Sequence, residues 1–422
     1  MGVKIVVVGG ASTYTPELVE GFVTRADRLP VDELVLLDVD ADRLDIVGGL
    51  AGRMLAAAGW GDRLTLTTHR SMALEGADFV LIQLRVGGQR ARLIDETLPL
   101  RFGCIGQETT GPGGFSKALR TVPVVLGIAE EVARLAAPSA WIVDFTNPTG
   151  IVTEALLNDG HRAIGLCNVA IGFQRLFADH LGIEPARVQL DHVGLNHLTW
   201  ERAVDVDGRD VLPQLLEAHL EALSAYTEIP PDRIEGLGAV PSYYLSYYYQ
   251  TPEILERQQH QPSRAEEVLG IEARLLDMYK DPSLTEKPKL LEERGGAFYS
   301  EAAAQLVASL YDGSGDLQVV DVRNRGALPD IDDDAVVEIP ARIDRGGAHP
   351  GSLAPLDPAM LDLVRRAKAY ERLTIRAATS GDRKVALEAL TANPLVEEEV
   401  APSLLHELLE AGRAHLPRFF PN

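Results

Sequence analysis

Short apolar runs alternate with helical stretches through the first 168 residues of the chain. Chains with this alternation fold into a parallel, doubly wound sheet that has helices on both faces. Except for residues 64–68, which alternate between leucine and threonine, the runs are apolar at consecutive positions, which is typical of strands that are buried on both sides. The predicted strands are residues 4–8, 33–38, 64–68, 78–84, 140–145 and 163–167, and the predicted helices are 16–25, 42–58 and 115–137. We therefore predict an α/β fold that is built on a doubly wound parallel sheet.

The pattern changes near residue 188. An extended segment, 188–206, is followed by Asp207-Gly208, which is a strong signal for a hairpin turn. The remaining chain is predicted to contain helices at 214–226, 264–279, 300–311 and 360–379, and a strand region at 331–342. We place a domain boundary near residue 168, which divides the chain into a doubly wound domain, 1–168, and an α+β domain, 169–422.

The composition excludes several classes of partner. A net charge of −22 over 422 residues makes nucleic acids and anionic membranes poor partners. No segment is long and apolar enough to span a bilayer, and residues 1–8 lack the features of a signal peptide. The chain has two cysteines, Cys104 and Cys167, so we expect no disulfide framework and a reducing compartment, the cytoplasm.

A glycine-containing turn joins the first predicted strand to the first predicted helix. Its residues Gly9, Gly10, Ser12 and Thr13 would let a pyrophosphate approach the backbone at the start of the helix. Asp38 ends the second strand, where an acid binds the ribose hydroxyls and repels a 2′-phosphate, so it favours NAD over NADP. Two simpler interpretations stay open, namely a tight structural turn and a helix cap at Asp38.

Cys167 and His197 form a candidate metal site. Cys167 ends a predicted strand, at the edge where open α/β sheets bind ligands, and His197 lies in the following extended segment. A thiolate and an imidazole are typical metal ligands, although each residue alone also fits a buried thiol or a core histidine. A nicotinamide cofactor together with a metal indicates redox chemistry on an alcohol.

A series of short motifs extends this pattern along the chain. The motifs are residues 9–16, 83–88, 91–92, 106–114, 146–148, 167–169, 194–197 and 244–248, and Arg264. In these motifs the chain resembles the family 4 glycoside hydrolases, in particular the members that act on 6-phospho-β-glucosides. The resemblance implies a lactate/malate-dehydrogenase-like fold, with NAD bound by residues 1–168. It also implies that residues 169–422 hold the substrate and a divalent metal, usually manganese.

The resemblance assigns roles to individual residues. Cys167 and His197 would hold the metal, and Tyr244 would act as the catalytic base. The implied reaction is hydrolysis by hydride transfer from C3 to NAD, removal of the C2 proton by Tyr244, elimination of the aglycone, addition of water and return of the hydride. A phenol is a weak base at neutral pH, so Tyr244 would need a nearby cation to lower its pKa.

Other residues would contact the substrate, which is a phosphorylated disaccharide or an aryl β-glucoside 6-phosphate. By resemblance these are Arg92, Asn147 and Arg264, with the arginines as cations for the sugar phosphate, and Glu108 is a further candidate contact. Asn168 stands where the α-acting relatives commonly have an aspartate, which favours a β-linked substrate.

Three alternative functions are also consistent with the sequence. One is an α-glucosidase or α-galactosidase of the same family. Another is an NAD-dependent hydroxy-acid dehydrogenase, which would need a His–Asp pair such as Asp191-His192. The last is a sensor of NAD or sugar phosphates without activity. Relatives form dimers and tetramers, so we also expect a homo-oligomer.

Overall fold

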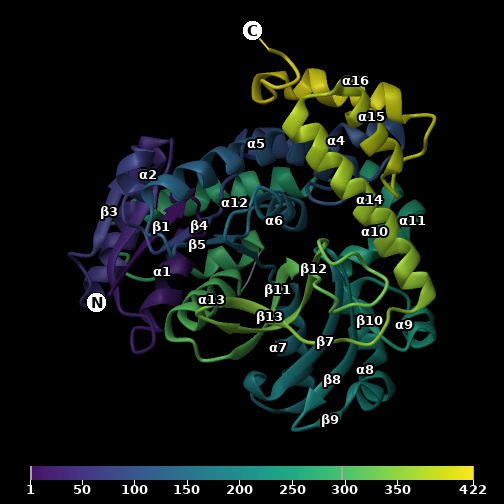
Figure 1. Ribbon diagram of the computed structural model, residues 1–422, viewed down its shortest axis with the longest axis horizontal. Coiled ribbons are helices and arrows are strands. Elements are labelled where there is room, and N and C mark those ends of the chain that lie inside the picture. Colours follow the sequence, from purple (N-terminus) through teal and green to yellow (C-terminus); the bar gives the residue numbers. More distant parts are fainter. Residues whose placement is uncertain (1, 296–297, 422) are drawn as a thin grey trace.

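The computed structural model describes residues 2–295 and 298–421. Its core is a nine-stranded sheet in the order β13-β12-β11-β6-β5-β4-β1-β2-β3 (Figure 1). The parallel part consists of β1 Val3–Val8, β2 Val31–Leu37, β3 Leu64–Thr67, β4 Phe79–Ile82, β5 Trp141–Asp144 and β6 Ala163–Gly165. These strands coincide with the predicted ones, so the doubly wound parallel sheet is confirmed.

Alternate side chains of β1 enter two different apolar cores. Ile5 and Val7 pack with α1 (Thr15–Val23), α2 (Ala41–Ala57), α7 (Val169–Leu181) and α13 (Tyr299–Asp312) on one face. Val6 and Val8 pack with α3 (Arg70–Leu74), α5 (Gly111–Leu135) and α6 (Thr149–Asn158) on the other face. Because both faces are covered, the strands must be apolar at consecutive positions, as the sequence indicated.

The strand order reverses at β1, which lies between β2 and β4. Open α/β sheets bind ligands beyond the carboxyl ends of the strands at such a reversal. The chain segments after β1, β4, β5 and β6 all leave the sheet at this edge, and they contain Gly9, Gln83, Asn147 and Cys167. The topology therefore brings these candidate residues to the same edge of the sheet.

A second sheet contains β7 (Val188–Leu195), β8 (Leu198–Val206), β9 (Arg209–Asp210) and β10 (Val240–Pro241). Asp207 and Gly208 join β8 to β9 with φ angles of 54° and 84°. Positive φ at both central positions is the geometry of a two-residue hairpin turn, so the predicted hairpin is confirmed. The sheet lies in the lower right of Figure 1, away from β1, β2 and β3 of the large sheet.

Strands from the second half of the chain extend the first sheet. β11 (Asp316–Arg323) pairs antiparallel with β6, and β12 (Val336–Asp344) and β13 (Gly347–Pro350) follow it outward. The sequence analysis missed β11, because its polar and charged residues obscure the apolar pattern that marks a strand. Residues on both sides of position 168 thus share one sheet, and the boundary between 1–168 and 169–422 stays a prediction.

The other helices surround these sheets, and α14 crosses from the second sheet toward α15 and α16 in the upper right of Figure 1. They are α4 Gly88–Thr97, α8 Leu212–Thr227, α9 Pro231–Leu237, α10 Ser246–Tyr249, α11 Thr251–His260, α12 Arg264–Tyr279, α14 Pro358–Ser380, α15 Arg383–Ala392 and α16 Ala401–Gly412. α12 matches its predicted bounds, 264–279. Within residues 2–295 and 298–421, none of the helices combines the length and the apolar character that crossing a bilayer requires.

Candidate active site

A cavity of about 1420 Å³ opens at the carboxyl edge of the parallel strands. Most of the residues that the sequence analysis selected line it. These are Gly9, Ser12, Asp38, Arg92, Glu108, Asn147, Asn168, Tyr244 and Arg264. The predicted nucleotide residues and the predicted substrate residues therefore border one continuous space.

The turn after β1 forms one wall of the cavity. Gly9 has a φ of 88°, and a Cβ at this position would lie 2.8 Å from the carbonyl oxygen of Gln83, so only glycine fits. Asp38 accepts a hydrogen bond from the backbone N–H of Ala11 at 3.0 Å, which fixes its carboxylate beside the turn. The N-cap of α2 is Asp40, not Asp38, so the simpler interpretation of Asp38 as a helix cap is wrong.

Gly10 and Thr13 do not line the cavity. A Cβ on Gly10 would lie 2.8 Å from the Cβ of Leu36, so this glycine lets the turn pack against β2. Thr13 is fully buried, and its carbonyl oxygen accepts a hydrogen bond from the hydroxyl of Tyr279 at 2.8 Å. Both residues shape the turn from behind, and a direct contact of either with the cofactor stays a prediction.

Cys167 and His197 lie just behind the cavity wall. Cys167 follows β6 and is buried, and the hydroxyl of Tyr299 donates to its Sγ at 3.6 Å. His197 occupies the turn between β7 and β8, with a φ of 62°, and its ring stacks on Tyr244. Tyr244 and Tyr299 both line the cavity, so each candidate ligand contacts a residue of its wall.

The chemistry of this pair fits a divalent metal. The Nδ1 of His197 lies 2.8 Å from the hydroxyl of Thr109, whereas its Nε2 is buried and has no hydrogen-bond partner among residues 2–295 and 298–421. Burial, and then Lys117, lower the pKa of His197 to about 3, so the imidazole is neutral and keeps a lone pair for a ligand. Among residues 2–295 and 298–421 there is no group of three His, Cys, Asp or Glu side chains that could enclose a metal. Substrate or solvent oxygens would therefore have to complete the coordination.

Tyr244 lies in a short 3₁₀ helix, η3 (Tyr243–Leu245), immediately before α10. Its ring packs against His197 with a centroid separation of 3.6 Å, and against Tyr243 with a separation of 4.6 Å. Burial raises the pKa of Tyr244 well above its usual range, and Tyr243 and Cys167 raise it further. The phenol is thus protonated in the protein alone and needs a metal cation to become a base at neutral pH.

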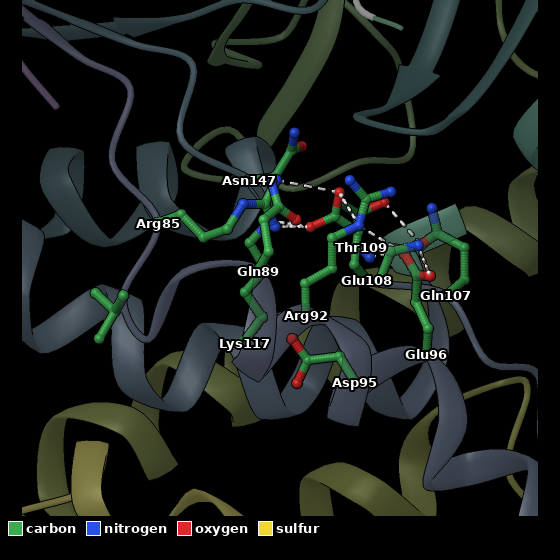
Figure 2. A network of polar contacts seen from close by, with 12 residues as sticks. Arg85, Gln89, Arg92, Asp95, Glu96, Gln107, Glu108, Thr109, Lys117 and Asn147 are labelled. Atoms are coloured by element: carbon green, nitrogen blue, oxygen red, sulfur yellow. Dashed lines mark hydrogen bonds and ion pairs between the residues drawn. The ribbon is translucent and has the colours of Figure 1, made fainter. Parts of the chain in front are cut away.

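Three cations converge on Glu108, as Figure 2 shows. Lys117 Nζ lies 2.7 Å from Glu108 Oε2, Arg92 Nε lies 3.3 Å from Oε1, and Arg85 pairs with both oxygens. Burial tends to raise the pKa of Glu108, but Arg85, Lys117 and Arg92 hold it well below its usual range. Glu108 lines the cavity as predicted, yet its oxygens are engaged by these cations. Its contacts indicate that it holds the cations in place, and a direct contact with substrate stays a prediction.

Arg264 begins α12 at the rim of the cavity. Its guanidinium donates to Glu267 at 2.7 Å and to the carbonyl oxygen of Glu293 at 2.6 Å, and its side chain is 44% exposed. Asn147 follows β5, and Asn168 immediately precedes α7. Both asparagines line the same cavity as Arg264, Arg92 and Glu108, so the structure brings all five predicted substrate contacts to one space.

Models of two domains match the chain, namely the family 4 glycosyl hydrolase domain over residues 4–183 and the C-terminal domain of the same family over residues 192–396. The chain belongs to glycosyl hydrolase family 4. A probable 6-phospho-beta-glucosidase of Bacillus subtilis is 45% identical over 99% of this chain and 98% of the relative. The resemblance that the motifs indicated is therefore confirmed.

Solved structures agree with the family. The 6-phospho-beta glucosidase of Thermotoga maritima, in a structure with manganese, NAD+ and glucose-6-phosphate, is 36% identical. It superposes with a TM-score of 0.92 over 98% of this chain and 99% of that chain. Malate dehydrogenase of Plasmodium falciparum, at 16% identity and a TM-score of 0.54, covers 91% of this chain and 99% of that chain. The dehydrogenase-like fold that we predicted for the family 4 enzyme is confirmed.

The structure removes the basis for the dehydrogenase alternative. His192 is fully buried, with its ring nitrogens 2.5 Å from Glu201 and 2.9 Å from Glu338. Asp191 pairs instead with Arg202 at 3.1 Å. Neither His192 nor Asp191 lines the large cavity, so the Asp191-His192 pair that this alternative required is not positioned for catalysis.

Sequence reasoning missed several residues of the cavity wall. Lys117 and Arg85 belong to the Glu108 cluster, and Arg43 and Arg294 pair with the buried Glu272. A lysine within the small and apolar residues at the start of α5 was a detectable signal for Lys117. No local signal marks Arg43 or Arg294, because their partner lies on a different element of the chain.

Proposed function

We propose that this family 4 enzyme hydrolyses 6-phospho-β-glucosides and uses NAD and a divalent metal, Mn²⁺, as cofactors. One observation carries the proposal. A single cavity is lined by the nucleotide turn with Asp38 and also by Tyr244, Asn147 and Arg264. A nicotinamide and a sugar that share this space would lie within reach of each other, as hydride transfer requires.

A β-linked substrate is favoured over an α-linked one. The Bacillus subtilis relative and the Thermotoga maritima relative are both named for 6-phospho-β-glucoside cleavage. Asn168 cannot protonate an α-linked leaving group as an aspartic acid would, because a carboxamide does not act as an acid near neutral pH. The family's α-glucosidase and α-galactosidase activities are therefore the less supported alternative.

The residues of the chain divide the work of the reaction. When bound, NAD supplies the acceptor for the C3 hydride, and the metal supplies positive charge that acidifies the proton on C2. Tyr244 removes the C2 proton, after which the aglycone leaves C1, water adds and the hydride returns. Arg92 and Arg264 bind the 6-phosphate, and Asn147 and Asn168 orient the sugar. The net reaction is hydrolysis without net oxidation.

The test is a screen of matched aryl 6-phosphoglucosides, α- and β-linked, with and without NAD and Mn²⁺ under reducing conditions. We expect cleavage of the β-linked compound that requires both cofactors, and little cleavage of the unphosphorylated β-glucoside. Full activity of NAD-free enzyme in a chelator would contradict the mechanism. Faster cleavage of the α-linked compound would contradict the substrate assignment.

The proposal includes a cellular location and an oligomeric state. We place the enzyme in the cytoplasm, where phosphorylated sugars and reduced thiols occur together and Cys167 stays available as a ligand. We also propose a homodimer or homotetramer. Light scattering of the purified protein tests the oligomeric state, and a monomer at micromolar concentration would contradict it.

A further inference from the structure

Helix α12 (Arg264–Tyr279) runs from the predicted substrate residues of the cavity to its predicted nucleotide residues. Its first residue, Arg264, lines the cavity on the substrate side. The backbone N–H of Ala265 donates to Glu96 at 2.7 Å, and the other oxygen of Glu96 lies 2.7 Å from Arg92 Nε. The N-terminal end of α12 is thereby tied to both arginines that are proposed to bind the sugar phosphate.

The other end of α12 contacts the nucleotide turn. The hydroxyl of Tyr279, the last residue of the helix, donates to the carbonyl oxygen of Thr13 at 2.8 Å. A 16-residue helix spans about 24 Å, at about 1.5 Å per residue. One rigid element therefore reaches from the sugar-phosphate residues to the turn that is expected to bind the pyrophosphate.

Glu272 links the middle of this helix to the nucleotide turn. It lies eight residues after Arg264, and Glu272 is only 4% exposed. One carboxylate oxygen lies 3.1 Å from Arg43, whose Nε donates to the carbonyl oxygen of Ala11 at 2.8 Å. Ala11 in turn donates its N–H to Asp38. The chain of contacts from Glu272 thus ends at the residue proposed to bind the ribose.

The second oxygen of Glu272 makes further contacts. It accepts hydrogen bonds from Arg294 at 2.7 and 3.0 Å and from Gln89 at 2.9 Å. Arg294 covers the ring of Tyr14, at 4.3 Å from the centroid, and both residues line the cavity. The buried Glu272 carboxylate thus holds two arginines, of which Arg43 bonds to Ala11 of the turn and Arg294 stacks on Tyr14 immediately after it.

We propose that Glu272 is a positioning residue that couples the binding of NAD to the binding of the phosphorylated sugar. The inference rests on the proposed function. Whichever ligand binds first fixes the position of α12 relative to the turn, so the second ligand meets a site that is already in its binding arrangement and binds more tightly. By linkage, the sugar phosphate must tighten NAD binding by the same factor as NAD tightens sugar-phosphate binding.

The experiment measures this coupling factor directly. Titration calorimetry of the Mn²⁺-loaded protein gives the Kd of NAD with and without saturating glucose-6-phosphate, and the reciprocal titration checks the factor. For the wild type we expect a factor of about 5 or more, within the usual range for coupled sites. Glu272→Gln keeps the size of the side chain but removes its charge, and we expect its coupling factor to fall toward 1.

Two further variants make the result specific. Asp277→Asn removes an exposed carboxylate from the same helix and should leave the coupling factor unchanged, because Asp277 contacts only Lys280 among the described ion pairs. Tyr279→Phe removes the other link to the turn and should lower the factor even if Glu272→Gln does not fold.

The possible results distinguish a failure of the proposed function from a failure of the coupling proposal. If the wild type binds neither NAD nor glucose-6-phosphate, the proposed function fails. If the wild type binds both ligands independently, the coupling proposal is wrong while the proposed function stands. The coupling proposal is equally overturned if the wild-type factor is large and folded Glu272→Gln retains it, or, where Glu272→Gln does not fold, if Tyr279→Phe retains it.

Discussion

The imidazole of His197 lies flat against the phenol of Tyr244, with ring centroids 3.6 Å apart and planes inclined by 9°. A candidate metal ligand and the candidate base thus hold each other in a fixed arrangement. His197 is buried and Tyr244 is partly buried. Neither ring carries a charge at neutral pH, because burial lowers the pKa of His197 and raises that of Tyr244. A bound metal would therefore have to supply the positive charge that activates Tyr244.

Replacing Tyr244 with phenylalanine should lower turnover by about 10²–10⁴-fold, the usual effect of removing a general base. The stacked ring remains, so the thermal unfolding temperature should change little. In D₂O, product formed by the wild type should carry deuterium at C2 if the base exchanges its proton with solvent. Tyr226→Phe is the matched control, because Tyr226 does not line the cavity. Full activity of Tyr244→Phe together with no isotope effect for C2-labelled substrate would exclude the elimination route.

The affinity for Mn²⁺ should rise with pH, by about tenfold per pH unit near neutrality. Burial, and then Glu338, raise the pKa of the Cys167 thiol, so a metal must displace its proton. His197, with a pKa of about 3, has no proton to lose. Calorimetry in buffers of different ionisation enthalpy should therefore detect about one proton released per metal. Cys167→Ser should weaken Mn²⁺ binding and Cys104→Ala should not, and a pH-independent affinity would argue against the thiolate as a ligand.

Arg264→Ala should lower kcat/KM for the 6-phosphoglucoside by a factor that corresponds to about 1.5–3 kcal/mol, the usual loss for a charge-assisted hydrogen bond. The unphosphorylated glucoside should be affected much less. Arg274→Ala, an exposed arginine on the same helix, serves as the control. Equal losses on both substrates would show that Arg264 does not recognise the phosphate.

The buried group Glu201–His192–Glu338 should make the protein less stable at alkaline pH. Burial alone would lower the pKa of His192, but Glu201 and Glu338 raise it from 6.5 to about 10. A histidine whose pKa is raised by folding stabilises the protein fully below pH 6.5, and this contribution disappears as the pH rises to about 10. We expect the wild-type free energy of unfolding to fall by on the order of a few kcal/mol across this window.

Urea unfolding at several pH values measures this effect. His192→Gln should have a flatter pH dependence than the wild type, because glutamine does not titrate. His349→Gln is the control, since His349 also lies 2.9 Å from a carboxylate but is half exposed. Parallel curves for the wild type and His192→Gln would contradict the raised pKa.

The sequence by itself determined the parts of this protein that depend on neighbouring residues. The apolar runs specified β1, β2 and β4 to β6, because strands that are covered on both faces must be apolar throughout, and alternating leucine and threonine specified β3 at the edge of the sheet. Asp207-Gly208 specified its hairpin, since its backbone needs positive φ at both positions. Four site residues could be predicted because each belongs to a short motif of consecutive residues, namely Gly9, Cys167, His197 and Tyr244.

Only the tertiary structure decided which charged groups meet. Glu272 pairs with Arg43, which lies 229 positions away, and with Gln89, which lies 183 positions away. His192 proved to be a buried partner of Glu338 rather than a catalytic residue, and β11 joined the first sheet beside β6. The physical reason is that a side-chain ion pair depends on how elements pack. The periodicity of a segment predicts which face of its helix or strand is buried. It does not predict which charged side chains from distant segments will contact that face.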